Sequence, residues 1–111
     1  MNFVVVGAGA WGTAFALHLA RAGHPVALVP RRVEQAEALT ATRENAEYLP
    51  GMRLPGGVRV TADLPAALAD ANVILLACPA QALRETCLRL DCALPANRSG
   101  GIVVSLAKGL E

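Results

Sequence analysis

A glycine-rich hexapeptide near the start of the chain constrains its fold more than any other feature. The segment Gly7-Ala8-Gly9-Ala10-Trp11-Gly12 directly follows Phe3-Val4-Val5-Val6, a run that is uniformly apolar rather than alternating. Such a run is typical of a parallel strand covered by helices on both faces. Small or apolar residues then recur at helical spacing between about Ala10 and Ala22. The glycines are therefore expected at the corner between a buried strand and a helix.

The same alternation continues along the chain. Further strands are predicted from the apolar runs Val26–Val29, Val58–Val60, Val73–Ala77 and Ile102–Ser105. Helices are predicted over Val33–Thr40, Asp63–Ala69 and Ala82–Leu90, with Asp63 as a cap and Thr42 as the cap of a further turn. This order predicts one α/β domain over residues 1–111. Its expected architecture is a Rossmann-type doubly wound parallel sheet in three layers, α/β/α, truncated after about five strands.

Composition excludes several classes of protein. Hydrophobic residues make up 54% of the chain and charged residues 17%, which argues for a packed core and against disorder. The formal charge of +1 gives no basic field for nucleic acid, and the apolar runs are far shorter than the roughly 18 residues of a membrane helix. We therefore expect a cytoplasmic protein with no nucleic-acid or membrane partner. The three cysteines match no zinc or disulfide spacing, so no metal is expected: Cys78, Cys87 and Cys92.

The strand, the glycines and the helix together match the dinucleotide-binding fingerprint. The pattern GxGxxG alone is weak, but its place inside a strand-helix-strand unit supplies the confirming context. Gly7 is expected to permit the tight turn, Gly9 to let the backbone approach a pyrophosphate, and Gly12 to let the helix pack closely on the sheet. Free N–H groups and the positive end of the helix dipole bind such an anion without a basic side chain.

The residues after the second strand indicate which dinucleotide is preferred. An NAD-selective site usually carries an acidic residue there, about 20 residues after the glycines. This chain has Pro30-Arg31-Arg32 instead, and two guanidiniums suit the 2′-phosphate of NADP. NADP is the predicted cofactor, with NAD second. Trp11 inside the glycine segment is expected to cover either the cofactor or a second domain, and both alternatives stay open.

These residues resemble a known family, the bacterial-type NAD(P)-dependent glycerol-3-phosphate dehydrogenases. The resemblance spans the whole chain and rests on Gly7–Ala14, Asn45 with Tyr48–Gly51, Leu54-Pro55, Pro79–Gln81 and Lys108–Glu111. The first and last of these motifs are specific in combination. They favour this family over another dehydrogenase, such as a ketopantoate reductase or a hydroxyacyl-CoA dehydrogenase. A nucleotide-sensing module without catalysis is the non-enzymatic alternative.

The resemblance implies reversible hydride transfer between NAD(P)H and dihydroxyacetone phosphate, which gives the sn-glycerol 3-phosphate used in phospholipid synthesis. By matched position, the cofactor would be contacted by Ala10, Trp11, Arg31, Arg32 and Tyr48. Lys108 would contact both cofactor and substrate. The family often has Ser at the position of Ala10 and a hydroxyl residue at that of Ala107, so two polar contacts are expected to be missing.

Family members also carry a further, mostly helical domain that supplies the general-base lysine and most contacts to the substrate phosphate. No catalytic residue is therefore expected among the 111 residues, and the isolated chain is expected to bind cofactor without appreciable turnover. A sheet that stops after the fifth strand would expose a buried-type strand at its edge. Such an edge predicts a homo-oligomer.

Overall fold

The computed structural model describes residues 2–44, 51, 53–69, 71–77, 84–86, 88 and 102–105. Its strands are β1 (Phe3–Val6), β2 (Val26–Val29), β3 (Val58–Val60), β4 (Val73–Leu76) and β5 (Ile102–Ser105). Its helices are α1 (Ala10–Arg21), α2 (Val33–Thr42) and α3 (Leu64–Ala69). All five predicted strands and the first three predicted helices are confirmed. Residues 84–86 and 88, within the fourth predicted helix, are helical as well.

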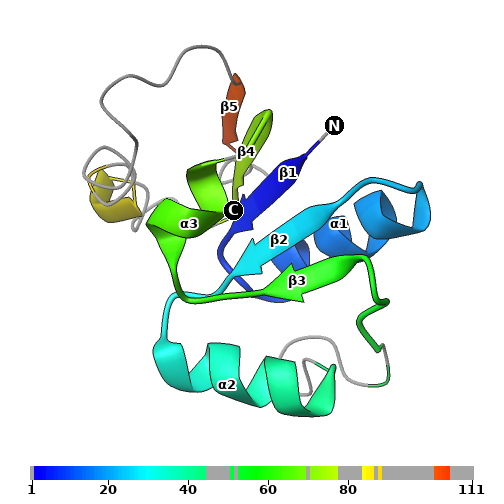
Figure 1. The fold of residues 1–111 in the computed structure, drawn as a ribbon. Helices are drawn as coiled ribbons and strands as arrows, with labels where there is room; N and C mark the ends of the chain where they lie inside the picture. The colour runs from blue at the N-terminus through cyan, green and yellow to red at the C-terminus, as the bar shows by residue number, and fades with distance from the viewer. Residues whose placement is uncertain are drawn as a thin grey trace.

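The five strands form one parallel sheet in the order β3-β2-β1-β4-β5 (Figure 1). Val6 at the end of β1 lies in register with Val29 of β2 and with Leu76 of β4. The chain thus moves outward from β1 to β3 and then returns to the other side of β1. Open α/β sheets bind ligands outside the carboxyl ends of the strands where the order reverses in this way. The glycine segment begins at this point.

Helices cover both faces of the sheet, which explains why its strands are uniformly apolar. Side chains alternate along a strand, so Val5 packs in one core with Leu17 of α1 and Leu39 of α2. Val4 and Val6 face the opposite side and pack in a second core with the α3 residues Leu64, Ala67 and Leu68. The predicted three-layer arrangement is confirmed.

The two helix ends predicted on either side of β3 differ in outcome. Asp63 caps α3 as expected, because its Oδ1 accepts a hydrogen bond of 3.2 Å from the N–H of Ala66. The further turn that Thr42 was expected to cap lies largely outside the described residues. Thr42 is the last residue of α2, and its hydroxyl donates to Ala38 O at 2.8 Å, so the helix runs two residues beyond its predicted end at Thr40.

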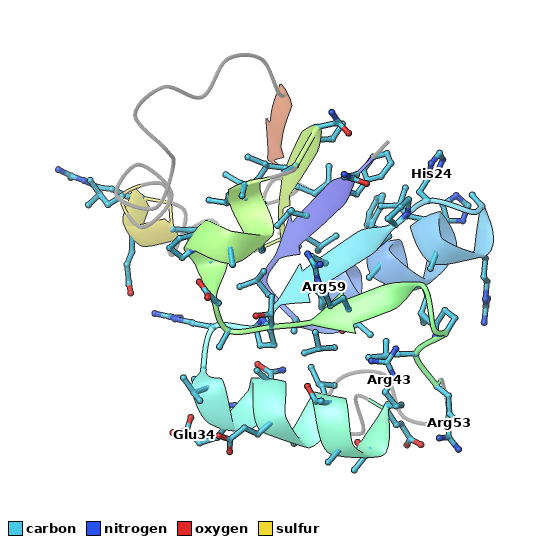
Figure 2. All side chains as sticks on the ribbon, in the orientation of Figure 1. His24, Glu34, Arg43, Arg53 and Arg59 are labelled. Atoms are coloured by element: carbon cyan, nitrogen blue, oxygen red, sulfur yellow. The ribbon has the colours of Figure 1, made fainter. Side chains whose placement is uncertain are left out.

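Arg43 joins the end of α2 to the start of β3. It is the only described residue other than glycine with a left-handed backbone, at φ 58° and ψ 28°. Its Nη2 donates to Pro55 O at 2.7 Å and to Val58 O at 2.6 Å, while its own carbonyl accepts from Leu54 N–H at 2.6 Å. Figure 2 shows Arg43 between the end of α2 and the segment that enters β3. The Arg43 side chain therefore fixes the segment that leads into the edge strand β3.

We expect Arg43→Ala to lower the free energy of unfolding by about 2–4 kcal/mol, because it removes two charge-assisted hydrogen bonds to carbonyls. Arg43→Gly loses the same bonds but relieves the left-handed backbone, so its loss should be smaller by about 1 kcal/mol. Urea unfolding of both variants measures the difference. A Gly variant less stable than the Ala variant would contradict the left-handed conformation of residue 43.

Candidate cofactor-binding site

The corner after β1 is built so tightly that only glycine fits at its first position. Gly7 has φ +112°, and a Cβ there would overlap the carbonyl oxygen of Ala77. Its N–H donates to Val29 O of β2 at 2.8 Å, while the N–H of Ala77, just after β4, donates to Val6 O at 2.9 Å. The corner is therefore fixed from both neighbouring strands.

Gly12 sets how closely α1 approaches this corner. A Cβ at Gly12 would overlap the carbonyl oxygen of Gly7 and would lie 3.1 Å from the Cβ of Ala77. The steric reasons expected for Gly7 and Gly12 are thus confirmed. Ala77 was predicted only as the end of a strand. Its small side chain matters here because it faces the helix across the corner.

Gly9, in contrast, faces open space. It is the N-cap of α1, with φ −75° and ψ −167°, and a Cβ built there meets nothing within 4 Å. No side chain caps this helix among the described residues, and its first turn holds no acidic residue. The N–H of Thr13 donates to Gly9 O at 3.0 Å, so the N–H groups of residues 10 to 12 precede this helical bond. The arrangement leaves room for an anion at the positive end of the helix.

The carbonyl of Ala8 is satisfied inside the protein. It accepts from the hydroxyl of Thr13 at 3.4 Å and from Nε2 of Gln35 at 3.1 Å. Thr13 is fully buried, and Gln35 lies in the first turn of α2. Two donors thus hold the carbonyl and tie α2 to the glycine corner. Neither role was predicted: Thr13 lies within the Gly7–Ala14 motif, whereas nothing in the local sequence signals a contact between residues 27 positions apart.

The segment after β2 presents two guanidiniums at the surface. Pro30 is fully buried, while Arg31 and Arg32 are exposed, and Arg32 is the N-cap of α2 in an extended conformation. Nη2 of Arg31 lies 3.2 Å and 3.4 Å from the two carboxylate oxygens of Glu85. The partner Glu85 was not predicted, because 54 residues separate the pair.

The comparison with known proteins decides the family. Residues 2–111 match the family model for the N-terminus of NAD-dependent glycerol-3-phosphate dehydrogenase. The chain belongs to this family. It is 49% identical over 110 residues to a glycerol-3-phosphate dehydrogenase [NAD(P)+] of Moorella thermoacetica, covering 99% of this chain and 32% of the relative. It is 43% identical over 111 residues to the corresponding protein of Prosthecochloris aestuarii, covering 100% and 32%.

Solved structures agree with this assignment to the glycerol-3-phosphate dehydrogenases. The crystal structure of the Coxiella burnetii enzyme matches with a TM-score of 0.81 and 33% identity, covering 97% of this chain and 34% of that one. The chain therefore spans about a third of the length of the curated relatives it matches. These matches settle the fold and the family.

Several residues predicted for this dehydrogenase domain lie outside the part of the chain that the structure describes. Tyr48 and Lys108 lie outside the described residues, as do the three cysteines: Cys78, Cys87 and Cys92.

Trp11 is 48% exposed and stacks on Phe15 with ring centroids 5.9 Å apart, so both alternatives for its partner remain. Within the described ranges no group of three metal-ligating side chains occurs, and no helix is long and apolar enough to cross a membrane.

A small hollow of about 150 Å³ lies at the amino ends of the strands, opposite the glycine corner. It is lined by residues that begin β1 and β2, together with Gly57, Arg59 and Ala67. Parallel sheets of this type bind their ligands at the carboxyl ends of the strands. The hollow in this dehydrogenase domain lies at the amino ends instead. The open corner at Gly9 is therefore the better candidate for the cofactor site.

Two alanine substitutions in the glycine corner should separate packing from ligand space. Gly12→Ala places a methyl group on a backbone carbonyl that cannot move independently of β1, so we expect about 3 kcal/mol of destabilisation. Gly9→Ala adds a methyl group in open space at an allowed φ, so its effect should stay within about 0.5 kcal/mol. Urea unfolding of both variants tests this. Equal stability of the two would contradict the packing described for α1.

Proposed function

We propose that this domain binds NAD(P)H with its pyrophosphate at the amino end of α1. The observation that carries the proposal is the open space at Gly9 beside the first-turn N–H groups. Those N–H groups donate to the anion, and the absence of an acidic residue from the first turn keeps the local potential positive. Thr13 and Gln35 hold the Ala8 carbonyl inward, so that acceptor does not oppose a negatively charged ligand.

The preferred cofactor is NADP, with NAD as the second. Arg31 and Arg32 are exposed after β2, beside the corner that receives the pyrophosphate. A guanidinium forms charge-assisted hydrogen bonds to a phosphate, and no acidic residue stands at the end of β2 to accept the ribose hydroxyls. The names of the relatives, which give the cofactor as NAD(P)+, agree with use of both dinucleotides.

We further propose that the whole protein interconverts dihydroxyacetone phosphate and sn-glycerol 3-phosphate in the cytoplasm, for phospholipid synthesis. The relatives are named as glycerol-3-phosphate dehydrogenases, and this chain corresponds to about a third of their length. The bound dinucleotide supplies or accepts the hydride. Within this chain, Lys108 and Tyr48 are the proposed contacts to substrate and cofactor. The general-base lysine comes from a further domain.

The substitution Gly9→Ala tests this function in the protein at its full length. The unchanged protein should oxidise NADPH when dihydroxyacetone phosphate is added. The methyl group in Gly9→Ala occupies the space of the pyrophosphate, so KM for NADPH should rise at least tenfold while stability is retained. Steady-state kinetics at saturating dihydroxyacetone phosphate measure this. An unchanged KM for NADPH in Gly9→Ala would refute the pyrophosphate site. If the unchanged protein bound NADPH but did not reduce dihydroxyacetone phosphate, a sensing module would be favoured.

A further inference from the structure

The ion pair between Arg31 and Glu85 joins the two segments that flank β1. Arg31 lies two residues beyond β2, and Glu85 lies in the helical residues 84–86 that follow β4. Because β2 and β4 are the parallel neighbours of β1, the two segments leave the sheet at the same edge, on either side of the glycine corner. Figure 1 shows the short helical segment of Glu85 (yellow) on the side of the sheet where β2 ends.

The carboxylate of Glu85 lies against the guanidinium of Arg31, which is the group proposed to bind the 2′-phosphate of NADP. One nitrogen of Arg31 lies within 3.4 Å of both oxygens of Glu85. The two side chains are 61% and 63% exposed, so water and salt screen their attraction and the pair opens at low cost. A dianionic phosphate can therefore displace Glu85, but it must compete with the carboxylate for the same guanidinium.

We infer that Glu85 is a specificity-determining residue. It weakens the binding of NADP and so reduces the preference of the site for NADP over NAD. Its carboxylate occupies Arg31 in the absence of a 2′-phosphate and repels that phosphate when it arrives. NADH carries no 2′-phosphate, so its binding does not require the pair to open. This inference rests on the proposed function of the domain, since it concerns the adenosine end of the same cofactor.

The test is a double-mutant cycle on Arg31 and Glu85 in the full-length protein. Dissociation constants of NADPH and NADH are measured by fluorescence titration. Glu85→Gln should tighten NADPH binding about two- to fivefold, the range that an exposed ion pair supplies, and leave NADH unchanged. Arg31→Ala should weaken NADPH binding about tenfold or more. In the Arg31→Ala background, the gain in NADPH affinity from Glu85→Gln should be clearly smaller, because only the repulsion between the carboxylate and the phosphate is then relieved.

Two controls separate the pair from general charge. Glu37→Gln, an exposed carboxylate on α2, removes the same charge elsewhere and should leave the ratio of the two constants unchanged. The gain in NADPH affinity caused by Glu85→Gln should also become smaller at 0.5 M salt. The screening length is then about 3–5 Å, so the charge of an exposed carboxylate has little effect on the phosphate. An unchanged ratio in Glu85→Gln, or an equal gain without Arg31, overturns this inference alone. Failure of the unchanged protein to bind either dinucleotide overturns the proposed function with it.

Discussion

The close approach of α1 to the corner after β1 is the constraint on which the rest of this structure depends. The helix reaches the sheet only because position 12 has no side chain, position 7 turns with a positive φ, and Ala77 is small. This contact aims the first turn of α1 at the edge where the strand order reverses. The proposed binding site is therefore a consequence of packing: Gly7 and Gly12 let the helix pack closely, and Gly9 between them leaves the helix end open.

Charge is distributed around this corner in a simple way. The glycine segment has no ionised side chain, and its N-cap glycine leaves the backbone to act as the donor. Arg31 and Arg32 follow β2, and a carboxylate, Glu85, approaches from the segment after β4. In the proposed complex, the backbone binds the pyrophosphate that both dinucleotides share, whereas the side chains face the 2′ position at which NADP and NAD differ.

Local sequence patterns predicted most of this fold for a physical reason. Each buried strand is a short apolar run, Asp63 lies next to the helix it caps, and the glycines lie within one turn of each other. The missed features are contacts across long stretches of chain. The bonds of Arg43 to the entry of β3, of Gln35 to Ala8, and of Arg31 to Glu85 depend on the packed sheet, which no local pattern encodes. The end of α2 was missed for a related reason, because the bonds of Arg43 help to fix where that helix stops.

The most direct test of the central claim is an NMR titration that follows backbone amides of the isotope-labelled protein as NADPH is added. The account predicts that the largest shifts occur at the amides of Gly9, Ala10, Trp11 and Gly12, because these N–H groups donate to the pyrophosphate. Shifts confined to Phe3, Val26, Gly57 and Arg59, around the hollow at the other edge of the sheet, would contradict it.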